Sequence, residues 1–199
     1  AAKACGGESR KDSLSEFSTF FDAFVMSPAV RAKYSAPTIS LTRYAGGHEV
    51  SNEVLPRAAY DARFPVVQED VYYKPRTPAR AGDDAEFLEI SIDQSSTNDF
   101  IVEWSRVNYD GNGEGGDDLG NRLDASGKII PHDVKLSAEG RLLFQPAAQC
   151  WKLISDVRIV PGDVLTYSVP ATITAQGQNL RFQVGLAGGS VAAPGGNAA

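Results

Sequence analysis

The clearest chemical pattern lies in an acidic, glycine-rich stretch between residues 108 and 124, NYDGNGEGGDDLGNRLD. Carboxylate and amide oxygens recur there at alternate positions, and Gly115 takes the sixth position, where a calcium loop bends sharply. Because oxygen ligands suit a hard divalent cation, the spacing is compatible with a weak calcium site, the one cofactor that the sequence suggests. The candidate metal ligands are Asp110, Asn112, Glu114 and Asp117.

The same stretch departs from a full calcium loop in three ways. Position eight is Asp117, where an apolar residue is expected. Position twelve is Asn121, where a bidentate glutamate is expected, and no helix precedes the loop. A solvated acidic hairpin tip is therefore the preferred interpretation, and the calcium site is the alternative.

Acid–base catalysis would need a histidine or a carboxylate that faces a cavity. The candidates are His48, Asp61, Asp70 and His132. Only His48 has a carboxylate beside it in the sequence, Glu49, and neighbouring residues on a strand point to opposite sides. The sequence contains no G-x-S-x-G, H-E-x-x-H or phosphate-loop motif. No catalytic residue is assigned, and a binding function is favoured over an enzyme.

Large aromatic side chains are the candidates for contact with an apolar ligand. They recur at the period of the helix or strand that carries them, which is also what a packed core requires. Core packing is the preferred interpretation, and the wall of a ligand pocket is the functional alternative. The candidate ligand-binding residues are Phe17, Phe21, Phe24, Trp104 and Trp151.

The opening residues, AAKACGGES, are small and polar, as after removal of an export signal, so a periplasmic or secreted protein is expected. In an oxidising compartment the two cysteines, Cys5 and Cys150, would form a disulfide that ties the start of the chain to the sheet. The alternative is a buried Cys150 and a free Cys5.

Composition limits the class of partner. A formal net charge of −6 argues against nucleic acid or an anionic membrane surface, because both attract clustered basic residues. The one basic run, KPRTPAR at residues 74–80, is interrupted by prolines and is interpreted as a solvated loop. No apolar segment approaches the roughly 20 residues of a membrane-spanning helix. The expected partner is a small apolar ligand or another protein, and homodimer formation stays open.

Two helices are predicted at the start of the chain. Ser13 and Glu16 form a capping box, and apolar residues then recur at helical spacing up to Val25. Ser27 followed by Pro28 is a second start signal, which predicts a short helix that ends before Pro37. A helical turn over residues 57–64 is also expected.

Strand periodicity begins at Thr38. Further strands are expected over residues 66–73, 86–92, 100–109, 129–136, 164–174 and 180–186. Residues 141–157 form two apolar runs split by a turn at Pro146, so we expect a hairpin in which Trp151 and Leu153 share the core face. The predicted fold is α+β, with N-terminal helices packed on a curved antiparallel sheet and extra C-terminal strands, and a β-sandwich is the alternative.

Two stretches resemble a known family. The segment EFSTFFDAFVMSPAVRAKYSAPTISL, an aromatic helix followed by a short helix and a strand that begins at a proline, resembles the opening of NTF2-like domains of exported bacterial proteins. The later segment QCWKLISDV resembles their penultimate strand. The resemblance covers residues 14–157 and implies a cone-shaped pocket between the first helix and the concave sheet, with a general base inside it in the family's enzymes.

A second stretch, VRIVPGDVLTYSV at residues 157–169, resembles the first strands of Ig-like repeats in bacterial surface proteins. The expected organisation is a flexible segment at residues 1–11, one α+β domain at residues 12–186 and a disordered glycine- and alanine-rich tail at residues 187–199. Three functions follow: an exported non-catalytic binding domain, a calcium-stabilised surface or adhesion module, and an acid–base enzyme with an NTF2-like cone. The first is preferred.

Overall fold

The computed structural model describes residues 14–79, 86–95, 98–113, 119–124, 126–147 and 150–160. The chain separates into two compact units, Ala1–Thr166 and Tyr167–Ala199, and every described residue belongs to the first unit. The predicted flexible start, the two C-terminal strands, the Ig-like segment beyond Val160 and the predicted tail lie outside the described residues.

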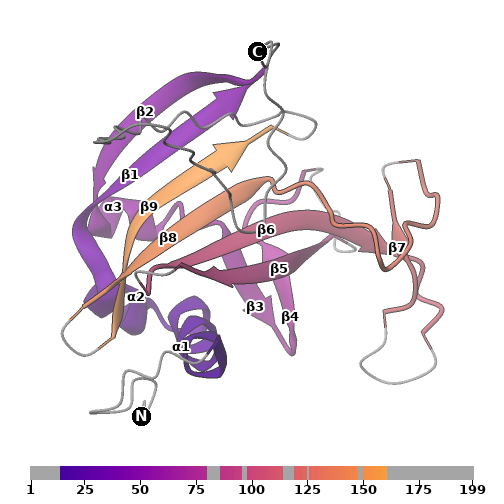
Figure 1. The fold of residues 1–199 in the computed structure, drawn as a ribbon, viewed down its shortest axis with the longest axis horizontal. Coiled ribbons are helices and arrows are strands. Elements are labelled where there is room, and N and C mark those ends of the chain that lie inside the picture. Colours follow the sequence, from indigo (N-terminus) through magenta and orange to yellow (C-terminus); the bar gives the residue numbers. More distant parts are fainter. Residues whose placement is uncertain are drawn as a thin grey trace, which may run out of the picture. The chain divides into compact units, whose positions relative to one another are not determined.

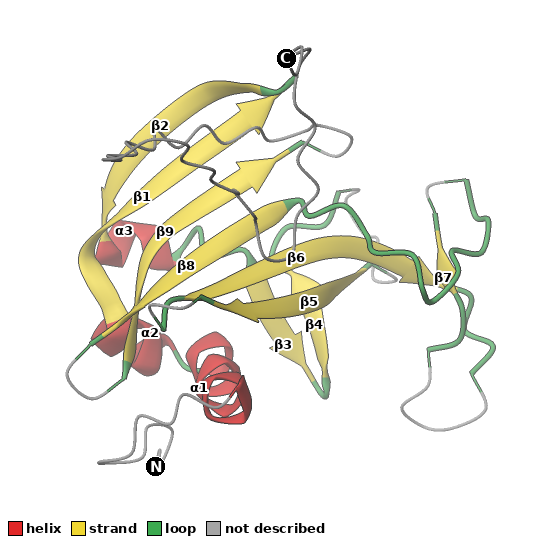
Figure 2. Cartoon of the chain, viewed as in Figure 1, coloured by secondary structure: helices red, strands yellow, loops and turns green. Residues whose placement is uncertain are grey.

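The two predicted N-terminal helices are confirmed. Helix α1 (Leu14–Met26) buries one aromatic face, and α2 (Pro28–Tyr34) begins at the expected proline, where the Ser27 hydroxyl accepts a hydrogen bond from the Val30 amide at 3.4 Å. The predicted helical turn forms α3 (Arg57–Asp61). These three helices are short, and the described part of the chain is rich in strands (Figure 2).

One large sheet dominates the described unit, with strand order β2-β1-β9-β8-β6-β5 (Figure 1). Its strands are β1 (Ser35–Ala45), β2 (His48–Pro56), β5 (Phe87–Gln94), β6 (Phe100–Tyr109), β8 (Gly140–Pro146) and β9 (Trp151–Ile159). Strand β7 (Arg122–Leu123) pairs with the end of β6. The predicted helix-plus-sheet class is confirmed, but the sheet is mixed rather than wholly antiparallel, because β1 and β9 pair in parallel.

Three strands of the sheet, β1, β6 and β9, run in the same direction, so their C-terminal ends lie at the same end of the sheet. Strand β9 is antiparallel to β8, and β8 is antiparallel to β6, so β6 runs the same way as β9 and β1. On the face of the sheet that is covered by α1, the strands β6 and β9 start with the large apolar residues Phe100 and Trp151. Side chains near the C-terminal ends of β1, β6 and β9 therefore meet at one end of the sheet, opposite the end that holds Phe100 and Trp151.

Helix α1 covers the end of the sheet that holds Phe100 and Trp151. Phe17 stacks on Phe100 with 4.0 Å between ring centroids, and the Trp151 ring meets Phe17 edge-on at 5.2 Å. Phe144 from β8 touches four phenylalanines of the helix: Phe17, Phe20, Phe21 and Phe24. Trp151 is 7% exposed, so its predicted place in the core is confirmed.

Two strand predictions are wrong. Residues 66–73 form a hairpin of β3 (Val66–Glu69) and β4 (Tyr72–Pro75) rather than one strand, because Asp70 adopts φ 53° and reverses the chain. Residues 129–136 form no strand beyond one bridge at Ile129. The buried Arg122 side chain donates instead to the carbonyl oxygens of Pro131 and Val134, which holds this segment as a loop.

Candidate functional site

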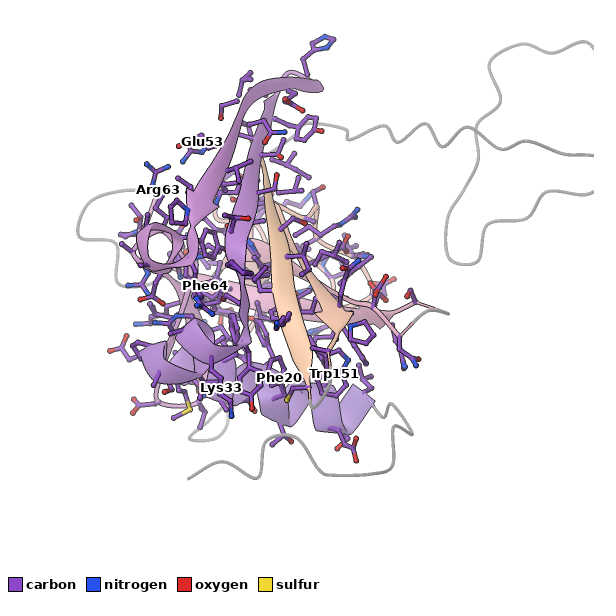
Figure 3. The ribbon with its side chains drawn as sticks, turned by 90° about the vertical axis from the view of Figure 1, so that its left-hand side faces the viewer. Phe20, Lys33, Glu53, Arg63, Phe64 and Trp151 are labelled. Carbon is purple, nitrogen blue, oxygen red and sulfur yellow. The ribbon has the colours of Figure 1, made fainter. Side chains whose placement is uncertain are left out.

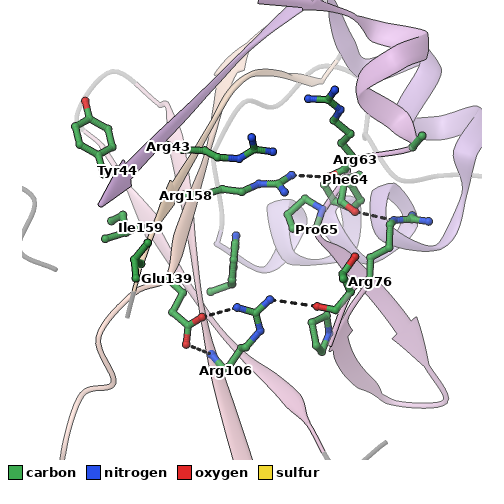
Figure 4. Close-up of a pocket in the computed structure, with 15 residues that line it drawn as sticks. Arg43, Tyr44, Arg63, Phe64, Pro65, Arg76, Arg106, Glu139, Arg158 and Ile159 are labelled. Carbon is green, nitrogen blue, oxygen red and sulfur yellow. Dashed lines mark hydrogen bonds and ion pairs between the residues drawn. The ribbon is translucent and has the colours of Figure 1, made fainter. Parts of the chain in front are cut away.

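A pocket of about 450 Å³ lies at the end of the sheet opposite α1. One wall is formed by the C-terminal parts of β1, β6 and β9 with the residue before β8, and the other by the segments that follow α3 and β4 (Figure 4). The volume falls within the range that small-molecule sites occupy in proteins. Figure 3 places Glu53 and Arg63 well away from Phe20 and Trp151, which lie beside the helices.

Arginine dominates the lining of this pocket. The arginines that line it are Arg43, Arg63, Arg76, Arg106 and Arg158. Two of them continue the apolar faces of their strands: Arg43 follows Ile39 and Leu41 at alternate positions, and Arg106 follows Phe100, Val102 and Trp104 in the same way. The sheet face therefore changes from apolar to basic along its own strands.

Arg158 reaches the same face through a β-bulge. Leu153 pairs with Phe144, but Ser155 pairs with Leu143, so Ile154 is an extra residue in β9. Strict alternation from Trp151 would place Asp156 on the outer face, whereas the bulge turns Asp156 and Arg158 inward. As a result, Arg158 is the register partner of Arg43 on the neighbouring strand.

A buried network holds Arg158 in place. The Asp156 carboxylate has no exposed surface, accepts a hydrogen bond from the Tyr60 hydroxyl at 2.8 Å and pairs with Arg158 Nη2 at 2.9 Å. Burial, and then the charge of Asp156, raise the pKa of Tyr60 well above its ordinary value, so the phenol donates. Burial alone would lower the pKa of Arg158, but Asp156 outweighs it and holds the guanidinium charged.

The other arginines differ in how far carboxylates neutralise them. Arg43 and Arg63 share Glu53, at 3.5 and 2.9 Å. Arg106 pairs with Glu139 at 2.7 Å and with Glu86 at 3.3 Å. Glu139 is the carboxylate that lines the pocket within the described chain, and both of its oxygens accept hydrogen bonds from Arg106.

Arg76 is held differently. Its Nε donates to the Phe64 carbonyl oxygen at 2.7 Å, which fixes the side chain against the wall opposite the sheet (Figure 4). Within the described part of the chain, no carboxylate lies within ion-pair distance of Arg76. The sequence interpretation of residues 74–80 as a solvated loop did not foresee that Arg76 lines a pocket.

The aromatic floor of the pocket depends on a glycine. Trp104 is 4% exposed, and its register partner on β8 is Gly140. A Cβ at Gly140 would lie 2.1 Å from the indole, so only glycine leaves room for this ring position. Among the described residues the Trp104 Nε1 has no hydrogen-bond partner, although it is buried.

The predicted aromatic ligand-binding residues divide between the two ends of the sheet. Phe17, Phe21 and Phe24 have no exposed surface and pack together with Trp151 in the core under α1. Trp104 is the one member of the set that lines the pocket. Four of the five predicted residues therefore pack in the core under α1, and the fifth, Trp104, lines the pocket.

In the predicted calcium loop, Asp110 closes its own turn. Its Oδ1 accepts from the amides of Asn112 and Asn121 at 3.0 and 2.9 Å, and its Oδ2 accepts from the Asn121 side chain at 2.8 Å. These hydrogen bonds, led by that of the Asn121 side chain, lower the pKa of Asp110 to about 2. Glu114 and Asp117 lie outside the described residues, so the calcium site stays a prediction.

The acid–base candidates lie apart. His48, Asp70 and His132 are exposed, and Asp61 pairs with the buried Arg31 at 2.6 Å. His132 lines a second, polar groove of about 340 Å³ between the outer face of β5 and β6 and residues 131–136. None of the four lines the arginine pocket.

Cys150 is buried and disulfide-bonded. Its predicted partner, Cys5, lies outside the described residues, so the pairing stays a prediction. In the described part of the chain no helix combines the length and the apolar character needed to cross a membrane.

Comparisons with known proteins do not assign a family. The sequence matches no protein-family model, and a search of curated proteins finds no significant relative. The pocket therefore has to be interpreted from its own residues. The sequence did contain a signal for the pocket. Arg43 and Arg106 occupy positions that continue the apolar face of their strands, and a charged residue at such a position indicates that the apolar core ends there.

Proposed function

We propose that this chain is a non-catalytic small-molecule-binding domain, whose site is the pocket lined by Trp104, Phe64 and the five arginines. The single observation that carries the proposal is the contrast in packing: α1 fills one end of the sheet with aromatic rings, whereas the other end encloses about 450 Å³. Apolar walls with a few convergent polar groups are typical of ligand sites.

Binding is favoured over catalysis because the pocket offers no free base among its described residues. Both oxygens of Glu139 are engaged by Arg106. The buried Asp156 is held by Tyr60 and Arg158. A general base needs an oxygen or nitrogen that can reach substrate, and neither carboxylate provides one in this arrangement.

The proposal also places the domain in the NTF2-like class. The order of the described elements supports this: two helices, a β1–β2 hairpin, and a later run of strands of which β9 returns to pair with β1. The resemblance implies a pocket between the first helix and the concave sheet, whereas aromatic rings fill that space and the proposed ligand pocket lies away from α1.

Export remains part of the proposal. The disulfide bond at Cys150 supports an oxidising compartment, because structural disulfides persist mainly outside the reducing cytosol. Thiol alkylation without reductant, followed by mass spectrometry, tests this. Labelling of neither cysteine is expected, and labelling of both in freshly isolated protein would contradict export.

The binding function is tested by a ligand-observed NMR screen of small organic compounds against the native chain. Ala62 lines the pocket, so Ala62→Trp should fill it and abolish binding of the hits. The matched control is Ala59→Trp, which adds the same ring on the exposed surface of α3, outside the pocket. Hits that persist in Ala62→Trp, or a screen without hits, would contradict the proposed function.

A further inference from the structure

We infer that the ligand of this pocket is a small organic anion, with a carboxylate or similar oxyanion held by Arg43, Arg158 and Arg76 and a flat apolar part against Trp104. This inference rests on the proposed function and adds the chemical class of the ligand. It is carried by the placement of charge inside the pocket of a protein that is acidic as a whole.

The first argument is the pairing of Arg43 with Arg158. They are register partners on the parallel strands β1 and β9, and both line the pocket. Figure 4 shows their side chains extending side by side from the sheet toward the opposite wall. Like charges on neighbouring strands repel, so an anion that bridges the two guanidinium groups would relieve an unfavourable contact.

The second argument is where the neutralising carboxylates lie. Glu53 and Asp156, which pair with Arg43 and Arg158, do not line the pocket. Glu139 does, but Arg106 satisfies it. Among the described residues, five arginines and one carboxylate therefore line the pocket, so the charge presented to a ligand is predominantly positive.

The third argument concerns the unused donors of Arg76. Arg76 Nε is fixed by the Phe64 carbonyl, and no described carboxylate pairs with its guanidinium group. Trp104 Nε1 is buried and has no acceptor in the described chain. The indole N–H lies against Gly140 and has no accessible surface, so Arg76 is the group whose remaining N–H donors can reach a ligand oxygen.

The size of the pocket and the charge of the chain exclude larger anions. A volume of about 450 Å³ suits a molecule of one or two rings and not a polymer. The formal net charge of −6 also opposes the counterion release that drives binding to nucleic acid or anionic membranes. The structure therefore favours a compact anion over a polyanion.

The test compares 2-naphthoate with 2-naphthamide, which has the same ring and shape without the charge, by calorimetric titration of the whole chain. We expect saturable binding of 2-naphthoate and binding of 2-naphthamide about tenfold weaker or less, because charge-assisted hydrogen bonds are lost. Arg76→Met should weaken 2-naphthoate by a similar factor and leave 2-naphthamide unchanged. Arg57→Met is the matched control, since Arg57 donates to the Ser35 carbonyl outside the pocket.

The outcomes separate the two claims. Equal affinity for both compounds, or an Arg76→Met variant that binds 2-naphthoate as well as Arg57→Met does, overturns the anion inference and leaves the binding function standing. Absence of binding by either compound up to its solubility limit contradicts both. Circular dichroism of each variant establishes that it is folded, and Arg43→Met provides a second pocket variant if Arg76→Met does not fold.

Discussion

The two ends of the sheet are built from the same strands but satisfy different physical requirements. At the α1 end Phe100, Phe144 and Trp151 lie among helix phenylalanines, and most of these rings have no exposed surface. At the other end the same faces carry arginines around a pocket (Figure 4). The difference shows that one face of a sheet can pack the hydrophobic core over part of its length and line a ligand pocket over the rest.

The largest expected effect is at the α1 end. Phe144→Ala removes a ring that contacts four helix phenylalanines, and the free energy of unfolding should fall by about 3–5 kcal/mol. The matched change at the pocket end is Arg63→Ala, which breaks a half-exposed ion pair with Glu53 and should cost less than about 1 kcal/mol. Denaturant unfolding measures both. Similar losses for the two variants would break the comparison.

The buried Asp156 is the exception at the pocket end. Asp156→Asn leaves Arg158 without its carboxylate and should cost about 3 kcal/mol. Tyr60→Phe removes one hydrogen bond and should cost about 1 kcal/mol. If Asp156→Asn is as mild as Tyr60→Phe, the network does not hold Arg158.

Tyr60 also gives a pH dependence of definite sign. Its folded pKa is raised, so its contribution to stability is fully present below the unfolded pKa near 10 and is lost as pH rises above that value. The stability difference between wild type and Tyr60→Phe should therefore shrink between pH 9 and about pH 11, measured by denaturant unfolding. A difference that grows over this range would contradict the assigned hydrogen bond.

Gly140 provides a smaller test of the pocket floor. Gly140→Ala would push on the Trp104 ring and should cost about 1–3 kcal/mol, with a change in tryptophan emission. Trp104→Phe in the Gly140→Ala background should recover part of the loss, because the smaller ring gives way. No recovery would mean that the glycine acts through the backbone and not through the indole.

The smallest effect is expected outside both ends, in the loop after β6. Carboxyl titration by NMR should give Asp110 a pKa of about 2. Asn121→Ala removes the main hydrogen bond and should raise this pKa toward its ordinary value. The stabilising contribution of the Asp110 carboxylate is present above its unfolded pKa and is lost as pH falls toward 2. An ordinary pKa for Asp110 in the wild-type protein would contradict the hydrogen bonds of this turn.

Local patterns predicted the elements whose cause is local. Helical spacing up to Val25, the cap at Ser27 and the alternation through residues 100–109 predicted α1, α2 and β6. The parallel pairing of β1 with β9 joins residues more than 100 positions apart, and no local signal encodes it. The hairpin at Asp70 was missed because a single residue at positive φ interrupts an otherwise strand-like run.

The site was harder to predict for the same reason. Arg43, Arg106 and Arg158 come from three strands that meet only through the sheet topology, and the bulge at Ile154 reverses the faces expected after Leu153. The sequence pattern did identify the large aromatic residues. However, their spacing is the same whether they pack in a core or line a pocket, so it could not separate Trp104 from the others. Trp104 differs because Gly140 opposite it leaves space.

The most direct test of the central claim is an NMR titration of the arginine Nε–Hε resonances and the aromatic resonances with 2-naphthoate. The account predicts saturable shifts for Arg43, Arg76, Arg158 and the Trp104 indole, and none for Phe17 or Phe144 under α1. Shifts centred on the rings beneath α1, or none in the pocket, would contradict it.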